Sequence, residues 1–541
     1  MTRLDWALCL VLMAVYGAVA FFNLGDVAAP QTNWAGEEPI MVDFGEAAAV
    51  GAVRFMAGPA HEQPFYIAFS PDGVEWSSHI YLETALTDPF AWRQVFLPEP
   101  VYARYGLIAP QAPGLILREM TFHTGAELHR LPIVGASPSG WPLFDEQHLA
   151  PDRPSFRNSA YFDEIYHART AYEYLHRLPA FENTHPPLGK VFISWGVSLL
   201  GMTPFGWRFM GALAGVLMLL PLYALAKRLF ASSGLAFLAA FVFAFDFMHF
   251  VQPRFATLDG FLVLAVICMY YFMYVYISTD FARTPFAKTL LPLFFCGWFM
   301  GIGLAVKWLG AFAAIGLAML FFAAVFRIPP KHRMITMAWC IPFFVLIPAL
   351  VYLLSYIPFT QAAGQAGLSA ILKNQADMFN YHGMLTATHP YSSPWWSWPL
   401  NLRPVFYYAS QLGDLRAGIS AFGNPAVWWL GIPAFCYAAY SALFKRDRAA
   451  AFLSVGYLAQ FLPWALIGRI AFIYHYFPSL PFLVLMNVFL IKHLAPGRWG
   501  GWAYAATVFA LFVLFYPVLS GWPIAASFAG FLRWLPGWQL V

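Results

Sequence analysis

The sequence predicts an all-α membrane protein with many spans and one β-sandwich outside the membrane. Of its 541 residues, 60% are hydrophobic and only 11% are charged, whereas a soluble domain carries about 25% charged residues. Several apolar runs also reach the roughly 20 residues that a helix needs to cross a bilayer. The net charge of +4 is too small over this length to indicate a nucleic acid partner. A soluble enzyme, a disordered chain and a nucleic-acid-binding protein are therefore excluded.

Polar breaks divide the apolar part of the chain into eleven predicted spans. They cover residues 6–23, 205–226, 232–250, 258–279, 289–304, 308–326, 335–356, 424–443, 449–467, 475–491 and 501–520. Lys and Arg gather in alternate breaks, which places the N-terminus in the cytoplasm by the positive-inside rule. The first span is long enough to be retained rather than cleaved as a signal peptide. We therefore expect a multi-pass protein of a bacterial inner or plasma membrane, or of the endoplasmic reticulum in a eukaryote.

The predicted spans and breaks give six segments along the chain. They are a first transmembrane helix (1–24), an external β-sandwich (25–157), an external catalytic loop with juxtamembrane helices (158–204), transmembrane helices two to seven (205–356), a large external loop (357–423), and transmembrane helices eight to eleven with the C-terminal tail (424–541).

The segment 25–157 is the part of the chain that does not have the composition of a membrane span. Its apolar density falls and Pro, Gly, Asp and Glu become frequent, which together with period-2 alternation predicts a small antiparallel β-sandwich. The alternating runs are Val53–Met56, Phe65–Phe69, Gln94–Leu97 and Leu115–Phe122. The stretch Phe65–Trp76 resembles the discoidin-like, galactose-binding-like sandwiches. Such domains bind glycans or only support other parts, so both roles stay open here.

Charged and polar side chains that lie close to membrane depth are costly and tend to be functional. In this chain they lie near one predicted face and come from separate segments, namely Asp163–His167, Glu182–Lys190, Arg208, Asp246–Asp259, Lys307 and Arg469–Tyr476. An acidic pair can supply a base for a hydroxyl or a metal ligand, and Arg and Lys can bind a phosphate. Each residue alone also has a structural explanation, such as a solvated pair, a helix stop, snorkelling or a local cap. Because all of them lie near the same predicted face of the membrane, the set favours group transfer from a lipid-linked phosphate donor.

The ordered motifs resemble those of the protein O-mannosyltransferase family, GT-C glycosyltransferases that use polyprenyl-phosphate mannose. The resemblance covers residues 1–23 and about 159–520. The motifs are Phe162-Asp163-Glu164, His185–Lys190, Arg208 with Gly211–Leu213, Asp246, Arg254–Asp259, Gly303–Gly310, Ser392–Pro399, Arg403-Pro404 and Arg469–Pro478. Two departures are a first loop lengthened by about 130 residues and a later loop, 357–423, too short for the β-trefoil of eukaryotic members. The chain is therefore similar to the bacterial branch.

The resemblance implies a GT-C fold and an inverting transfer at the outer face of the membrane. It implies that Asp163 is the general base and that Glu164 holds the acceptor or positions Asp163. The residues that would neutralise the leaving phosphate are Arg208, Lys307 and Arg469. The residues expected to contact the substrate or shape the pocket are His167, His185, Lys190, Asp246, Arg254, Asp259, His475 and Tyr476.

The donor, acceptor and partners follow from the same resemblance. The expected donor is a polyprenyl-phosphate sugar, most simply mannose, and the expected acceptor is Ser or Thr of an exported protein. A glycolipid or cell-envelope polysaccharide acceptor is the alternative, as in the related transferases that move aminoarabinose to lipid A. A transporter or flippase is disfavoured because the chain shows no internal repeat. No cofactor is fixed, a divalent metal stays open, and a homo- or heterodimer in the bilayer is compatible with the family.

Overall fold

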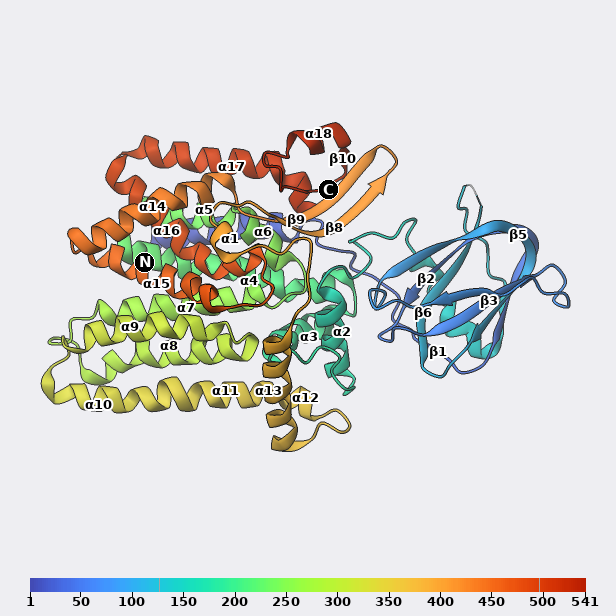
Figure 1. The fold of residues 1–541 in the computed structure, drawn as a ribbon, viewed down its shortest axis with the longest axis horizontal. Helices are drawn as coiled ribbons and strands as arrows, with labels where there is room; N and C mark the ends of the chain where they lie inside the picture. The colour runs from blue at the N-terminus through green and yellow to red at the C-terminus, as the bar shows by residue number, and fades with distance from the viewer. Residues whose placement is uncertain (126, 496) are drawn as a thin grey trace. The chain divides into compact units, whose positions relative to one another are not determined.

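The computed structural model describes residues 1–125, 127–495 and 497–541. These residues pack into two compact units. The helical unit comprises residues 1–22, 177–193 and 209–541, and the sheet unit comprises residues 23–176 and 194–208. Figure 1 shows the helices of the first and the strands of the second. The residues 158–176, which the sequence assigned to a separate loop, therefore pack with the strands.

Nine described helices are long and apolar enough to cross a membrane. They are α1 (Arg3–Phe21), α4 (Pro204–Phe230), α7 (Asp259–Ile277), α8 (Phe286–Val306), α10 (Pro330–Ile341) joined to α11 (Ile347–Ser355), α14 (Pro425–Phe444), α15 (Arg448–Phe461) extended by a 3-10 helix to Leu466, α16 (Leu480–Leu494) preceded by a 3-10 helix from Ile473, and α17 (Arg498–Ser520). A tenth span within the described chain would be α5 (Ser233–Ala244) with α6 (Phe247–Val251), which are bent by 64°. The multi-pass membrane protein predicted from composition is confirmed.

Each of the eleven predicted spans coincides with a helical element, but two of them are not long straight helices. The predicted span 232–250 is the bent pair α5 and α6, because Asp246 accepts a hydrogen bond from Met248 N at 2.9 Å and starts a new helix. The predicted span 308–326 is α9 (Gly310–Val325), which has 16 residues. Length alone therefore supports fewer spans than the eleven predicted.

The loop 357–423 contains structure that the sequence did not predict. It holds α12 (Ile357–Thr360), α13 (Gly367–Met384) and an antiparallel hairpin of β8 (Val405–Leu412) and β9 (Leu415–Ala421). Gly413 has φ +62 in the two-residue turn, a conformation that Gly adopts without strain. The short β10 (Ile524–Ala525) pairs with β9, and α18 (Ala526–Phe531) follows it.

The sheet unit contains seven strands, helix α2 (Glu164–Leu175) and the second half of helix α3 (Leu188–Leu200). The strands are β1 (Trp34–Gly36), β2 (Ile40–Ala57), β3 (Pro64–Ser70), β4 (Ile80–Glu83), β5 (Trp92–Pro110), β6 (Leu115–Thr124) and β7 (Gly135–Ala136), in the order β1-β6-β2-β5-β3-β4 with β7 beside β2. The four predicted runs fall within β2, β3, β5 and β6. Helix α3 begins in the helical unit.

Hydrogen bonds link the seven strands into one antiparallel sheet. Strand β2 has register shifts between Asp43 and Ala48 and between Val50 and Ala52, and such bulges bend a strand. Side chains from its first half, such as Val42, and from its second half, such as Phe55, lie in one buried apolar cluster. The sheet therefore encloses a single core.

The chain enters and leaves the strands of the sheet unit at one neck. Asp26 N donates to Arg157 O at 2.7 Å, and Arg157 Nη2 lies 2.8 Å from Asp26 Oδ1. Nearby, Glu146 Oε2 accepts hydrogen bonds from the backbone N–H groups of Gln31 and Thr32, at 2.7 and 2.9 Å. The two ends of this long insertion are therefore held together.

Candidate active site

The acidic pair lies where α2 begins in the sheet unit. Phe162, the residue before it, has φ +51, a left-handed conformation that is costly for a bulky side chain and is frequent at functional sites. Asp163 occupies the N-cap position, and its carbonyl accepts from His167 N at 3.0 Å, while its side chain does not cap the helix. Asp163 is partly exposed, whereas Glu164 is fully buried. The two neighbouring carboxylates thus have different environments.

Glu164 and Arg208 form a bidentate ion pair inside the sheet unit. Arg208 Nε and Nη2 donate to the two carboxylate oxygens of Glu164, both at 2.7 Å, and both side chains are 0% exposed. The guanidinium also donates to Leu24 O at 2.8 Å and to Ser159 O at 3.0 Å, and it lies 4.9 Å from the centroid of the Tyr161 ring. Arg208, predicted to bind phosphate, is therefore fully engaged in holding Glu164.

The strands of the sheet unit hold the segment that precedes the acidic pair. Ala160 N donates to Phe90 O at 3.0 Å, and Trp92 N donates to Ser159 Oγ at 2.9 Å. Because Ser159 O also accepts from Arg208, hydrogen bonds run from the start of β5 to the ion pair of Glu164.

A second set of contacts joins α2 to the sheet. Arg118 on β6 is buried and donates to Asn33 Oδ1 at 3.2 Å, and Asn33 Nδ2 donates to Tyr172 OH at 2.9 Å. The Tyr172 and Phe90 rings lie 5.2 Å apart, and the Arg118 guanidinium lies 5.3 Å from the Phe90 ring centroid. The sheet therefore fixes both ends of α2.

His167, predicted to contact substrate, is buried on α2. Two residues further along, Arg169 Nε lies 2.9 Å from Glu173 Oε1, and its Nη1 lies 2.8 Å from Nδ1 of His61, which comes from the loop after β2. These contacts extend the attachment of α2 to the strands.

In the helical unit, the loop before α3 is organised by a buried lysine. Lys190 is fully buried, forms an ion pair with the Glu182 carboxylate, and donates to Glu182 O and His185 O, each at 2.9 Å. His185 Nδ1 lies 2.9 Å from Glu182 Oε1. Burial lowers the pKa of His185, Glu182 raises it, and the charges of Lys307 and Lys190 lower it again, with a net lowering. Lys190, predicted to bind substrate, holds this loop, and His185 lies within reach of the Lys307 charge.

Asp259 and Lys307 form another buried ion pair of the helical unit. Lys307 Nζ lies 2.8 Å from Asp259 Oδ1, with side chains 10% and 3% exposed. Asp259 Oδ2 accepts from Gln252 Nε2 at 3.2 Å, and Gln252 Oε1 accepts from Tyr407 OH at 2.6 Å. The hairpin strand β8 thus supports the carboxylate that holds Lys307.

Aromatic rings surround the cations of the helical unit. Lys307 Nζ lies 6.0 Å from the centroid of the Tyr474 ring, and the His475 ring lies 4.6 Å from that of Tyr474 and 4.5 Å from that of Trp464. Burial lowers the pKa of Arg469, and Tyr474 raises it. Arg469 makes no ion pair with any residue of 1–125, 127–495 or 497–541. It is thus a half-buried cation that a ligand phosphate could neutralise.

His382 on α13 was not predicted, although it lies in the same electrostatic environment. Its Nε2 lies 2.8 Å from Thr184 O. Burial, the neighbouring imidazole of His185 and the positive charges of Arg469 and Lys307 lower the pKa of His382 to about 4. Nothing in its local sequence marks it, because its partners lie about 200 residues away in the chain.

The histidine at position 382 gives a testable pH dependence of stability. The pKa of His382 in the folded protein lies below the value of about 6.5 in an unfolded chain. The contribution of His382 to the free energy of unfolding is therefore complete above pH 6.5 and is lost as the pH falls towards 4. We expect His382→Gln, which keeps a donor for Thr184 O, to lose less thermal stability between pH 7.5 and pH 5 than the unchanged chain. Equal losses in both proteins would contradict this assignment.

Three predicted substrate residues are placed inside the helical bundle. Asp246 is fully buried, and its Oδ2 accepts from Asn424 N and Trp428 Nε1, both at 3.1 Å. Tyr476 is also fully buried and hydrogen bonds to Tyr457 OH at 2.6 Å. The prediction of substrate contact therefore does not fit these two residues, which fix the packing of loops instead. Arg254 is nearly buried, donates to Phe22 O at 2.8 Å, and lies over a phenylalanine ring.

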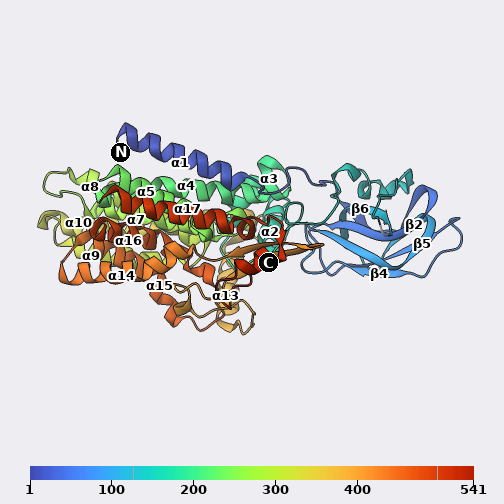
Figure 2. The same cartoon turned by 90° about the horizontal axis from the view of Figure 1, so that it is seen from above.

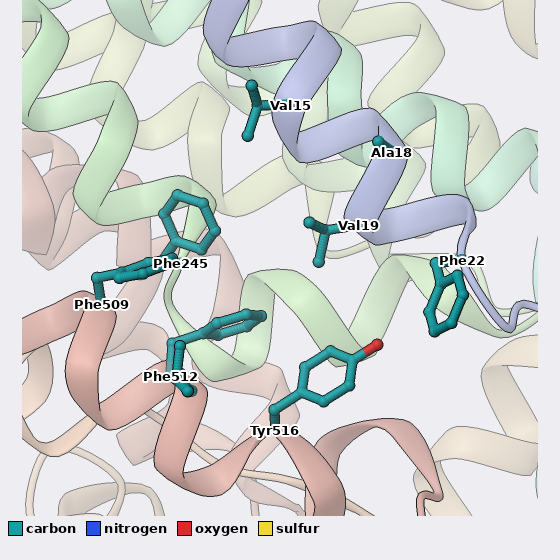
Figure 3. Close-up of a pocket in the computed structure, with 9 residues that line it drawn as sticks. Val15, Ala18, Val19, Phe22, Phe245, Phe509, Phe512 and Tyr516 are labelled. Atoms are coloured by element: carbon teal, nitrogen blue, oxygen red, sulfur yellow. The ribbon is translucent and has the colours of Figure 1, made fainter.

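The described residues offer no cluster of metal ligands, and a groove beside α1 is lined almost entirely by apolar side chains. Within residues 1–125, 127–495 and 497–541, no group of three or more His, Cys, Asp and Glu side chains is arranged to hold a metal ion. A groove of about 500 Å³ lies between α1, the end of α5 and α17, and Figure 3 shows its phenylalanine and valine lining. Tyr516 is its one residue with a side-chain oxygen, so this groove suits hydrocarbon rather than phosphate.

Comparison with known proteins supports the family that the motifs resemble. Residues 201–361 match the family described as dolichyl-phosphate-mannose-protein mannosyltransferase, and residues 368–538 match the C-terminal four TMM region of protein-O-mannosyltransferase. The chain is 28% identical over 472 residues to a polyprenol-phosphate-mannose–protein mannosyltransferase of Mycobacterium tuberculosis, which covers 74% of this chain and 87% of the relative. The corresponding protein of Corynebacterium glutamicum is 27% identical over 473 residues, with 75% and 89% covered.

A solved structure shows the same fold at low identity. The S. cerevisiae protein O-mannosyltransferase Pmt1-Pmt2 complex bound to the sugar donor matches with a TM-score of 0.61 and 14% identity, covering 70% of this chain and 89% of that chain. The bundle therefore has the GT-C fold expected from the resemblance. Since the two family matches together cover more than half of the sequence, the chain belongs to the protein O-mannosyltransferase family and is a membrane glycosyltransferase.

Proposed function

We propose that this protein transfers mannose from polyprenyl-phosphate mannose to Ser or Thr hydroxyls of exported proteins, with inversion at the anomeric carbon. The reaction takes place at the outer face of the plasma membrane, with the N-terminus in the cytoplasm. The bacterial relatives are named for this donor and for protein as acceptor, and the positive-inside pattern supports the orientation.

The observation that carries this proposal is the asymmetry of the acidic pair. Glu164 is buried and neutralised by Arg208, whereas Asp163 is partly exposed at the start of the same helix. Asp163 therefore serves as the general base: it takes the proton of the acceptor hydroxyl as that oxygen attacks the anomeric carbon and the carbon–oxygen bond to the phosphate breaks. Glu164 and Arg208 position Asp163, and polyprenyl phosphate leaves.

The leaving phosphate is stabilised by cations of the helical unit. Arg469 is half-buried without a carboxylate partner among the described residues, and Lys307 is held in place by Asp259. Fixed positive charges where negative charge develops are the largest usual contribution to such transfers. His185 and His475 line the same group, and the neutral form of His185 suits contact with a sugar hydroxyl.

The sheet is proposed to have a discoidin-like fold and to support the loop that carries Asp163. Its hydrogen bonds to Ser159, Ala160 and Tyr172 favour this scaffold role over that of a separate glycan-binding module.

The test is transfer by the purified full chain in detergent or vesicles. Polyprenyl-phosphate [³H]mannose is supplied with a Ser/Thr peptide or with cell-envelope glycolipid. Label on the peptide supports the proposal, and label on the glycolipid alone overturns its acceptor. Absence of donor consumption under conditions that preserve the fold would overturn mannose as the sugar.

Arg469 is predicted to be the cation with the clearest effect on the leaving group. We expect Arg469→Met to lower kcat/KM by about 10²- to 10³-fold, the usual effect of removing one charge-stabilising donor, and Arg469→Lys to retain part of the activity. Arg416→Met removes an exposed arginine of the hairpin and serves as the control. Unchanged kinetics in Arg469→Met would exclude contact with the phosphate.

A further inference from the structure

Helix α13 of the helical unit lies across the bundle rather than along it. Figure 1 shows it crossing the direction of α8, α10 and α11, and Figure 2, turned by 90°, shows α8 and α10 running along the bundle. It begins at Gly367, shortly after the membrane-spanning helix that ends at Ser355. A helix that lies across the spanning helices at their end runs parallel to the membrane plane.

The side chains of α13 are sorted onto different sides of the helix. Leu368, Leu372 and Phe379 are 62%, 59% and 70% exposed, and their spacing of four and seven residues places them in one stripe. The ion pair of Lys373 and Asp377, 2.9 Å apart, lies on the opposite side and is exposed. This arrangement is typical of helices that lie in the membrane interface.

The helix continues an almost fully exposed apolar surface. Only 11% of the apolar stretch within the span Pro330–Ser355 is buried inside the protein. Exposed apolar side chains follow one another from Leu350 and Leu354 of this span to Ile357 and then Leu368. The stripe on α13 thus follows directly on a surface that faces lipid.

The inner side of α13 holds the loop that carries His185. Asn374 Nδ2 donates to Asn183 O at 2.9 Å, and His382 Nε2 lies 2.8 Å from Thr184 O. The rings of His382 and His185 lie 5.4 Å apart. One helix therefore connects the exposed stripe to the backbone on which His185 is placed.

We infer that α13 is a membrane-interface helix: Leu368, Leu372 and Phe379 lie at the boundary of lipid headgroups and acyl chains and hold the His185 loop at a fixed depth. A bilayer fits better than a second protein, because a stable protein interface buries about 800 Å² on each partner and this stripe has three side chains beside a charged pair. The inference that the stripe lies in the membrane interface does not depend on the proposed function. The expected effect of the stripe on mannose transfer rests on that function.

Spin labels on the full chain in phosphatidylethanolamine–phosphatidylglycerol vesicles test the position. Cys340 and Cys436, the cysteines of the described chain that are not buried, are first replaced by Ser. Labels are placed at Phe379→Cys and, as the matched control, at the exposed neighbour Asn380→Cys. Oxygen should relax the label at position 379 more than a water-soluble nickel chelate does. At position 380 the nickel chelate should relax the label more than oxygen does. Equal access of nickel to both labels, or spin–spin broadening from a second copy at position 379, would overturn the inference.

Transfer kinetics in the same vesicles test the connection to the site. Leu372→Asn combined with Phe379→Asn should lower kcat/KM for the lipid-linked donor by about tenfold to a hundredfold, since small displacements in a site have effects of this size. Asn380→Ser should leave it unchanged. Normal kinetics in the double variant would overturn the connection. Inactivity of the unchanged chain would count against the proposed function, whereas the label accessibility requires no activity.

Discussion

Asp163→Asn is expected to lower kcat by about 10²- to 10⁴-fold, the range that general-base catalysis contributes. The amide has nearly the same shape as the carboxylate but cannot take the proton of an acceptor hydroxyl. The side chain of Asp163 is partly exposed and does not cap α2, so the loss should come without a loss of fold. The measurement is transfer of labelled mannose to peptide, together with thermal unfolding of the same preparation.

The control for this variant is Asp145→Asn, which removes an exposed carboxylate from the same unit. It should transfer mannose at the unchanged rate. Turnover of Asp163→Asn within a few fold of the unchanged chain, with donor and peptide at saturation, would exclude Asp163 as the base.

Glu164→Ala is expected to destabilise the sheet unit by about 3–5 kcal/mol, because it leaves the fully buried guanidinium of Arg208 without its carboxylate. Arg208→Lys should also be harmful, since an ammonium cannot make both 2.7 Å hydrogen bonds. Both variants should be inactive, and the loss should appear in denaturant or thermal unfolding measured beside transfer.

The double variant Glu164→Gln with Arg208→Met separates stability from activity. Replacing both partners removes the unpaired buried charge and should recover much of the stability, while transfer stays low because the support of Asp163 is gone. A single Glu164→Ala variant as stable as the unchanged chain would show that the pair is not shielded from water.

The parts of the fold that depend on patterns in neighbouring residues could be predicted from the sequence. The parts that depend on contacts between residues far apart in the chain could not. Apolar length marks each membrane helix along the chain, and the alternation in β2, β3, β5 and β6 marks the strands. The bend between α5 and α6 begins at the local cap that Asp246 forms with Met248, but the other carboxylate oxygen accepts from Asn424, which lies 178 residues later. The hairpin of β8 and β9 did have a local signal, a Gly413-Asp414 turn between alternating residues, which the sequence interpretation did not use.

The candidate site shows the same division. Asp163, Lys307 and Asp259 could be predicted as site residues because a charged side chain in or near a membrane is energetically costly and is usually kept for a function. The sequence could not say which charges neutralise one another, since Glu164 and Arg208 are 44 positions apart and Lys190 pairs with Glu182, a residue to which no role in the site was assigned. The types of residue can be predicted from the sequence, but their pairing needs the fold.

The neck of the sheet unit bears on how this architecture could arise. Asp26 and Arg157 are 131 positions apart in the chain, yet one hydrogen bond of 2.7 Å joins their backbones. A genetic insertion between two such adjacent points adds a whole module without moving the flanking chain, as is general for modules whose termini lie close together. A short loop could therefore have occupied this place in an ancestor, and the later contacts with α2 attached the acquired module to the helix that begins at the acidic pair.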